Sequence, residues 1–359
     1  MMFGGKLIVP PPAIVDRQFV KPLLCGPGPC DVWPSVAEAV TRPILSPICD
    51  ELFNVMDDIR AGIQYMFQTR SKLVLAMSGS GHSGMEAVIS NLLAPNETLA
   101  IATRGIWDER ARDVATRYGI KCVVSKVGVS ETFSLAQLEL LLKENRPQAL
   151  FITHGDSSTG SVQDLRGLGD LCHKYNALLL VDTVVSLGAE PFFMDEWGVD
   201  GVYASSQKAL SGPAGISPVG FSERAEYHHT LSPPLLWALR NCLAEVCRTT
   251  LPVFWARHAA TTEHFQKRVE QLALKLLITK PEDRLVTVTT VVLPKGYDYL
   301  EFIKFIRDKH NILIFAGLGP TVGKALRIGI MGVNSTTQVA DAIADAIADG
   351  LVALKRSSL

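Results

Sequence analysis

The chain has 359 residues, of which 47% are hydrophobic and 20% are charged, so it exceeds one average domain and has enough apolar residues for a sizeable core. Its 35 basic and 36 acidic residues leave a net charge of −1 with no long basic run, which argues against nucleic acid as a main partner. No apolar stretch approaches the roughly 18 residues that span a bilayer, and the seven cysteines are scattered, so we expect a globular intracellular protein with reduced thiols, no membrane span and no metal site.

Residues 1–20 contain three consecutive prolines from Pro10 to Pro12 and no clear periodicity, and we expect them to form an N-terminal arm. Apolar residues at helical spacing between Leu52 and Met66 predict the first long helix. Beyond it, short apolar runs alternate with helical patterns. The predicted strands are Leu73–Met77, Thr98–Ala102, Cys122–Val124, Leu150–Thr153, Leu178–Asp182 and Gly201–Ala204, and the predicted helices begin at Met85 and cover Trp107–Tyr118, Leu135–Asn145 and Leu165–Lys174. Repeated strand–helix units predict an α/β fold with a mostly parallel central sheet and helices on both faces.

The pattern changes after about residue 250. A long helical run is followed by two further strands and two further helices, predicted at Val253–Leu277, Val286–Leu293, a helix from Tyr299, Ala325–Ile330 and a final helix from Thr336. We therefore expect a large domain over residues 21–249 and a smaller α+β C-terminal domain over residues 250–359.

A glycine-rich turn, Gly79-Ser80-Gly81-His82-Ser83-Gly84, follows a predicted strand and precedes a predicted helix. Small residues at such a turn let backbone N–H groups approach a phosphate at the helix N-terminus. The spacing fits a dinucleotide fingerprint, but the strand that follows ends at Arg104 and carries no carboxylate for a ribose. An NADP-dependent oxidoreductase with Arg104 on the 2′-phosphate, and a turn that binds no ligand, both stay open at this point.

Asp182 ends one predicted strand, and Lys208 lies just past another short one. Since ligands of parallel sheets bind beyond the carboxyl ends of the strands, both side chains are expected in one crevice with the glycine-rich turn. Either could instead be a solvated loop residue. Together, however, a phosphate loop, a strand-end carboxylate and a strand-end lysine are the parts that pyridoxal phosphate requires: the lysine binds it covalently and the carboxylate keeps its ring nitrogen protonated.

Motifs along nearly the whole chain strengthen this interpretation. They are Leu24-Cys25-Gly26-Pro27-Gly28-Pro29, Ser78-Gly79-Ser80-Gly81-His82, Gly105-Ile106-Trp107, Thr153-His154-Gly155-Asp156-Ser157-Ser158-Thr159-Gly160, Ser206-Gln207-Lys208-Ala209-Leu210, Tyr227-His228-His229-Thr230 and Gly317-Leu318-Gly319-Pro320. With these motifs the chain resembles the alanine–glyoxylate/serine–pyruvate aminotransferases, a class V family of fold-type-I pyridoxal-phosphate enzymes that also includes the insect 3-hydroxykynurenine transaminases.

The resemblance implies a role for each matching residue. Lys208 would bind the cofactor and move the proton, and Asp182 would pair with the ring nitrogen. The remaining cofactor-binding residues would be Ser80, Gly81, His82, Trp107, Ser157 and Gln207, with Tyr227 and Thr230 reaching in from the second subunit of a homodimer. Ser157 would also lie beside the substrate, and Arg327 would bind its carboxylate through a bidentate fork.

The sequence departs from the family after Ala225. Only Glu226 separates it from Tyr227, where the family has an aromatic-rich segment, so roughly thirty residues, about two average helices with their loops, are absent. We therefore keep a catalytically impaired relative as an alternative. At the other end, Ser357-Ser358-Leu359 resembles the peroxisomal Ser-Lys-Leu signal; we expect a peroxisomal location, or otherwise a cytoplasmic or mitochondrial one.

The sequence thus predicts a transaminase acting on small amino acids and 2-oxo acids, with alanine or serine as donor and glyoxylate or pyruvate as acceptor. A 3-hydroxykynurenine transaminase is the alternative within the family. The preferred donor depends on the shape of the pocket, which these motifs do not determine.

Overall fold

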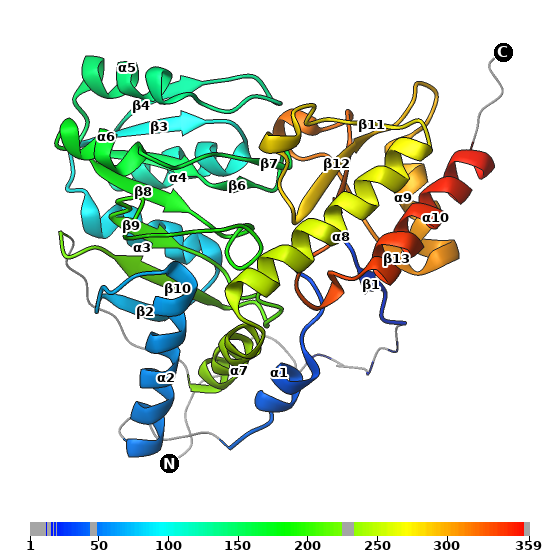
Figure 1. Ribbon diagram of the computed structural model, residues 1–359, viewed down its shortest axis with the longest axis horizontal. Coiled ribbons are helices and arrows are strands. Elements are labelled where there is room, and N and C mark those ends of the chain that lie inside the picture. Colours follow the sequence, from blue (N-terminus) through cyan, green and yellow to red (C-terminus); the bar gives the residue numbers. More distant parts are fainter. Residues whose placement is uncertain are drawn as a thin grey trace, which may run out of the picture.

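The computed structural model describes residues 12, 16, 18, 20–43, 49–224 and 233–354, with the side chains of 233–235 excepted. Figure 1 shows a large sheet with its helices at one side of the molecule and a smaller sheet at the other, with the long helix α8 (Leu251–Gln271) running between them. Most of the N-terminal arm, residues 225–232 and the last five residues lie outside the described part. The predictions for Tyr227, Thr230 and Ser357-Ser358-Leu359 therefore fall outside it.

The large sheet has seven strands in the order β2-β10-β9-β8-β5-β3-β4. Their bounds are Val74–Ser78 for β2, Thr98–Thr103 for β3, Lys121–Lys126 for β4, Ala149–Thr153 for β5, Leu178–Asp182 for β8, Gly201–Tyr203 for β9 and Ile216–Phe221 for β10. The five strands from β9 to β4 run parallel. Only β10 is antiparallel to both of its neighbours, and the sequence did not predict this strand.

Helices cover both faces of this sheet, as predicted. On one face, α3 (Gly81–Leu92) and α4 (Ile106–Arg117) share a buried cluster with strand residues such as Ile101 and Leu180. On the other face, α5 (Leu135–Asn145) and α6 (Leu168–Lys174) share a cluster with Ala100 and Val181. Neighbouring strand residues therefore point to opposite cores, which explains why these strands read as continuous apolar runs.

Three further helices pack together beside the sheet: α1 (Pro34–Ala39), α2 (Asp50–Phe67) and α7 (Pro233–Thr249). The sequence predicted α2 but neither of the others. Helix α6 begins three residues later than predicted, because its N-cap, Gly167, adopts a left-handed conformation with φ of 75° and residues before it cannot continue a right-handed helix.

The second sheet is antiparallel, with strand order β11-β12-β15-β14. Its strands are Lys275–Leu276, Val288–Val292, Leu326–Gly329 and Phe315–Ala316 in that order, and α8, α9 (Tyr299–His310) and α10 (Thr337–Ala353) form a buried cluster with it. Helix α8 ends six residues before the predicted Leu277, since Ala273 has a positive φ of 58° and β11 pairs with β12. The domain boundary at residue 250 stays a prediction.

Shorter elements complete the chain. They are the strands Leu23–Leu24 (β1) and Ile312–Leu313 (β13), the hairpin strands Gly155–Asp156 (β6) and Ser161–Val162 (β7), and the 3-10 helices Pro281–Asp283 (η1), Gly319–Thr321 (η2) and Gly332–Asn334 (η3). In the part of the chain that is described, no helix is both long and apolar enough to cross a membrane.

Candidate active site

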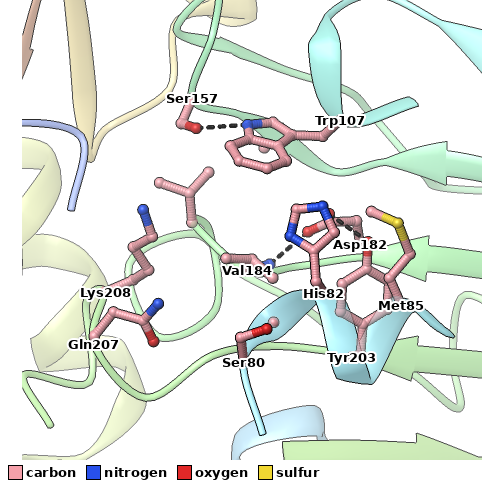
Figure 2. A pocket seen from close by; sticks show the side chains of 13 residues that line it. Ser80, His82, Met85, Trp107, Ser157, Asp182, Val184, Tyr203, Gln207 and Lys208 are labelled. Atoms are coloured by element: carbon pink, nitrogen blue, oxygen red, sulfur yellow. Dashed lines mark hydrogen bonds between the residues drawn. The ribbon is translucent and has the colours of Figure 1, made fainter. Parts of the chain in front are cut away.

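A pocket opens beyond the carboxyl ends of the parallel strands, where β8 and β9 lead into loops and α3 begins (Figure 2). The residues lining it are Ser80, Gly81, His82, Met85, Trp107, Gly155, Ser157, Asp182, Val184, Val185, Tyr203, Gln207 and Lys208. Eight of the residues predicted from the sequence are therefore brought to one cavity, although Ser80 and Lys208 lie far apart in the chain. Their individual roles stay predictions.

The N-terminus of α3 provides an anion-binding end to this pocket. Ser80 is the N-cap residue and its side chain makes no capping hydrogen bond. The N–H groups of Gly81 and His82 have no hydrogen-bond partner among the described residues. A Cβ at position 81 would lie 3.2 Å from Val184 and 3.3 Å from Ser205, so glycine keeps this end open. Unpaired N–H groups at a helix N-terminus favour a phosphate.

Gln207 lies on the wall of the same pocket (Figure 2). Its Oε1 accepts a hydrogen bond from the hydroxyl of Ser205, which fixes the orientation of the amide. The Nε2 group has no partner in the described part of the chain and remains a donor for an anion.

Asp182 ends β8, the central strand of the seven. Oδ1 accepts the backbone N–H of Val184 at 2.7 Å, and Oδ2 accepts the Tyr203 hydroxyl at 2.5 Å. Both donors are neutral, and no cation is hydrogen-bonded to the carboxylate within the described residues. Burial raises the pKa of Asp182 to about 7, against the lowering effect of these two hydrogen bonds. A buried carboxylate in this state is stabilised by a protonated nitrogen in the pocket.

Lys208 is half-buried and lines the same pocket, and its Nζ donates to the carbonyl oxygen of Pro27 at 2.6 Å. Desolvation is the main cause that lowers its pKa to about 8; the charge of Arg327 also lowers it, whereas Cys30 and Asp182 act in the opposite direction. A lysine with a pKa near neutrality has a substantial fraction of unprotonated amine, which is the form that attacks a carbonyl carbon and accepts a proton.

Trp107, in the first turn of α4, forms the opposite wall. Its Nε1–H donates to Ser157 Oγ at 2.8 Å, and its ring lies 5.7 Å from the ring of His82 at an interplanar angle of 69°. Figure 2 shows the indole across the cavity from Ser80. The hydrogen bond holds the indole in one rotamer, which leaves its face toward the pocket.

Arg327, on β15, is not one of the residues that line the pocket, but it reaches the loop that does. Its Nη1 donates to the backbone carbonyl of Ser157 at 3.1 Å and its Nε to that of Ala316 at 2.8 Å. Burial lowers the pKa of Arg327, yet a guanidinium stays charged throughout the physiological range. The structure therefore places a fixed positive charge next to Ser157.

Tyr203 is the residue that sequence reasoning missed. It faces Asp182 because Asp182 and Tyr203 are paired in register on neighbouring parallel strands. Both strands were predicted, but the second was predicted to end at Ala204, so the pairing of Asp182 with Tyr203 requires the register that the structure provides. Val184, Val185, Met85 and Gly155 were also missed, and they contribute the apolar surface and the close backbone of the pocket.

The prediction that Arg104 could bind the 2′-phosphate of NADP is wrong. Arg104 is buried, and its guanidinium donates to Ser161 Oγ at 2.7 Å and to the carbonyl oxygen of Thr153. It forms the centre of a buried network with Asp108 and Asp156 rather than facing a ligand. Among the described residues, no group of three or more His, Cys, Asp and Glu side chains is placed to bind a metal ion.

The fold and this site together define a class of protein. A helix terminus with free N–H groups, a buried carboxylate with no cationic partner among the described residues and a half-buried lysine in one cavity fit the phosphate, the ring nitrogen and the aldehyde of pyridoxal phosphate, respectively. The donor set of this pocket thus accommodates that cofactor.

Comparison with known proteins identifies the family. The sequence model of the aminotransferase class-V family matches residues 39–235. The alanine–glyoxylate aminotransferase of Rattus norvegicus is 39% identical over 386 aligned positions, covering 98% of this chain and 93% of the rat protein. That of Drosophila melanogaster is 37% identical, covering 93% of this chain and 94% of the fly protein. The chain therefore belongs to the class-V aminotransferase family; it is a pyridoxal-phosphate-dependent aminotransferase.

Solved structures agree with this assignment. The crystal structure of an alanine–glyoxylate aminotransferase from Nostoc sp. has a TM-score of 0.91 and 35% identity, covering 94% of this chain and 97% of that one. A ureidoglycine–glyoxylate aminotransferase from Bacillus subtilis has the same TM-score at 23% identity and shows the fold alone. The predicted fold class and family are confirmed, and the comparisons favour neither the oxidoreductase nor the 3-hydroxykynurenine alternative.

The alignment with the rat protein also bears on the missing segment. It has 386 positions, whereas 98% of 359 residues is about 352, so about 34 positions have no residue of this chain. This number agrees with the roughly thirty residues expected to be absent after Ala225.

Proposed function

We propose that this protein transfers the amino group of alanine, or of serine, to glyoxylate or pyruvate. The observation that carries the proposal is the convergence of Lys208 and Asp182 with the free N-terminus of α3 in one pocket, beside the guanidinium of Arg327. The names of the relatives in rat, fly and Nostoc support alanine and glyoxylate as one substrate pair.

Each residue then has a task in the reaction. The N–H groups of Gly81 and His82 and the amide of Gln207 bind the phosphate end of the cofactor, and Trp107 covers the face of its ring. Asp182 holds the ring nitrogen protonated. When bound, the cofactor supplies an electron sink that stabilises negative charge at the substrate's α-carbon.

Two residues act directly on the substrate. Lys208 removes the proton from the α-carbon as a general base and then, as a general acid, delivers it to a different atom. Its pKa of about 8 suits both roles near neutral pH. Arg327 binds the carboxylate shared by the donor and the acceptor. Overall, alanine gives up its amino group and leaves as pyruvate, and glyoxylate takes up that group and leaves as glycine.

The test is a steady-state assay with the purified, cofactor-loaded protein. Alanine or serine with glyoxylate or pyruvate should give parallel double-reciprocal lines, the pattern of a ping-pong mechanism. Lys208→Ala should remove nearly all turnover and the borohydride-trappable link to the cofactor while the protein stays folded. Turnover of 3-hydroxykynurenine alone, or trapping of the cofactor at another lysine, would contradict the proposal.

We also propose that the protein is a homodimer in which Tyr227 and Thr230 complete the site of the other subunit; the family resemblance supports this. A subunit mixing experiment tests it. Lys208→Ala and the double variant Tyr227→Phe/Thr230→Ala should each be impaired, but mixed dimers should regain activity, because one of their two sites then has every residue. Absence of recovery in dimers shown to be mixed would exclude shared sites.

For the cellular location we propose the peroxisome, supported by the resemblance of Ser357-Ser358-Leu359 to its import signal. A fluorescent protein fused to the N-terminus should colocalise with peroxisomes and become diffuse when the tripeptide is removed. An unchanged distribution would refute this location signal.

A further inference from the structure

Four consecutive backbone carbonyl oxygens tie the loop that carries Ser157 to the second sheet and to segments beside it. This loop, residues 157–160, connects the hairpin strands β6 and β7. The donors to its carbonyls, taken in order from residue 157, are Arg327 Nη1 at 3.1 Å, Thr321 Oγ1 at 2.9 Å, Thr290 Oγ1 at 2.6 Å and the N–H of Leu285 at 2.9 Å. An uninterrupted series of carbonyls bonded to another part of the fold leaves the loop little freedom to move.

The donors are themselves well fixed. Thr290 and Arg327 are paired directly opposite each other on β12 and β15. Thr321 ends η2, and its hydroxyl accepts the N–H of Leu318 at 2.9 Å; the carbonyl of Leu318, at 3.1 Å, is a second and longer acceptor for the proton that the hydroxyl donates to Ser158. Thr290 and Thr321 are buried, so water does not replace these hydrogen bonds when they are lost.

Gly160 shows how closely the loop lies on the second sheet. Its φ is +82°, and a Cβ there would lie 2.6 Å from Thr290 Oγ1 and 2.9 Å from the carbonyl oxygen of Val288. Both the left-handed backbone and the close approach require glycine. The loop is therefore seated on β12 rather than loosely beside it.

The other side of the loop is held by α4. Ser157 Oγ accepts the indole N–H of Trp107 at 2.8 Å, and Ser158 Oγ accepts the backbone N–H of Ile106 at 3.2 Å. The loop thus joins the helix that presents Trp107 to the strand that presents Arg327. Its position sets the distance between the wall of the cofactor pocket and the guanidinium.

Arg327 keeps donors for a ligand in this arrangement. A guanidinium has five N–H groups, and the carbonyls of Ala316 and Ser157 take one each. The donor remaining on Nη1 and the two on Nη2 suffice for an end-on fork to a carboxylate. The same nitrogen, Nη1, that would take part in the fork also binds the loop, so a displaced loop would turn the guanidinium.

We propose that Thr290 and Thr321 are positioning residues for the substrate carboxylate, which act by fixing loop 157–160 and through it the guanidinium of Arg327. The inference rests on the proposed function, since it assumes that Arg327 binds that carboxylate. Neither threonine is among the residues that line the pocket, so both act through the loop.

The test uses the holoenzyme of Thr321→Val and Thr290→Val, which keep the shape of the side chain and remove the hydroxyl. Each should raise the KM for alanine about two- to tenfold, the range expected for one net hydrogen bond. The value of kcat and the content of bound cofactor should stay near those of the wild type. Amides 158–161 should exchange faster with deuterium, a readout that does not depend on turnover.

Two kinds of variant serve as controls. Thr321→Ser and Thr290→Ser retain the hydroxyl and should restore both KM and exchange. Thr289 is a neighbour of Thr290 on β12, and its buried hydroxyl accepts a hydrogen bond from Gln266 at 3.5 Å rather than bonding to the loop. The KM of Thr289→Val should therefore stay unchanged. If one valine variant does not fold, the other, from a separate element, still decides the question.

An unchanged KM in a folded valine variant, a fall in kcat at constant KM, or failure of the serine variants to restore KM would overturn the inference. These results differ from a failure of the proposed function. A wild-type protein that turns over no amino acid, or an Arg327→Lys variant with unchanged KM, would refute that function instead.

Discussion

The hydroxyl of Tyr203 donates a hydrogen bond to Oδ2 of Asp182 at 2.5 Å across two neighbouring strands, at the centre of the large sheet. The phenol is fully buried, and its ring stacks on Phe151 at a centroid distance of 6.4 Å. Packing thus holds the donor in place, and the hydrogen bond favours the ionised form of the carboxylate that burial disfavours. The charge state of Asp182 therefore depends on a residue of the adjacent strand.

The first prediction is that Tyr203→Phe shifts the pH dependence of turnover. Without the phenol, the carboxyl of Asp182 loses a hydrogen bond that favours its ionised form, so its pKa rises in the loaded enzyme as well. We expect kcat/KM to fall about tenfold at pH 7, as for a lost hydrogen bond to a charged group, and to recover toward pH 9. The acid limb of the profile should move to higher pH. The control is Tyr299→Phe, which removes an exposed hydroxyl bonded to the carbonyl of Lys324. If the acid limb of the Tyr203→Phe profile does not move, the prediction is wrong.

A second prediction concerns the stability of cofactor-free protein. Its Asp182 has a pKa of about 7, above the ordinary value of 3.8. Such a group stabilises the fold relative to the unfolded chain at low pH, and this contribution is lost as the pH rises from about 4 to 7. The loss corresponds to at most about 4 kcal/mol. Asp182→Asn has no charge to bury, so it should be more stable than the wild type at pH 8 by about 1–3 kcal/mol, with little difference near pH 4.

Denaturant unfolding of both cofactor-free proteins at the two pH values measures this difference. The same substitution should weaken activity strongly in the loaded enzyme, because the ring nitrogen loses its counter-charge. A variant that is less stable at pH 8, or that turns over normally, would show that Asp182 does not have the assigned role.

The parallel core of the sheet and the two strand-end residues, Asp182 and Lys208, could be predicted from the sequence because apolar runs and strand ends are local signals. Strand β10 could not, since Pro218 and Gly220 interrupt its pattern although it lies between two other strands. The pair Tyr203–Asp182 requires the register between strands. The bond between Arg327 and Ser157 joins residues 170 positions apart, and no local pattern carries that information.

The third prediction concerns the reactivity of Lys208. Since burial and the charge of Arg327 lower its pKa to about 8, its amine should react with acetic anhydride in cofactor-free protein with a midpoint near pH 8 rather than near the usual 10.5. Arg327→Gln removes a like charge and should raise that midpoint. Mass spectrometry of the labelled peptides, with an exposed lysine such as Lys275 as internal reference for the reagent, measures both values. A labelling midpoint above pH 10 for Lys208 in the wild type would contradict the lowered pKa.

The last prediction concerns the segment that is absent after Ala225. A groove with an apolar floor lies between α2, the edge strand β2 and the start of α7, and includes Phe53, Met56, Val74 and Leu236. Phe53 is 49% exposed there. Apolar surface of this kind is usually covered in a stable protein, and α7 begins at Pro233, eight residues after Ala225. Tyr227 follows the end of β10 by six residues, and at about 3.5 Å per residue the chain can therefore reach at most roughly 21 Å from that end.

We therefore expect this chain to be folded but less stable than a family member with the segment, and to bind the cofactor more weakly with lower activity. Inserting a family-like segment of roughly thirty residues between Ala225 and Tyr227 should raise the melting temperature, reduce the binding of a hydrophobic dye and tighten cofactor binding. An insertion of equal length composed of glycine and serine lengthens the chain before Tyr227 but covers no apolar surface. It should therefore restore cofactor affinity without the gain in stability. If the chain as it stands binds pyridoxal phosphate tightly and turns over at the rate of the chimera, the segment is dispensable and the prediction is wrong.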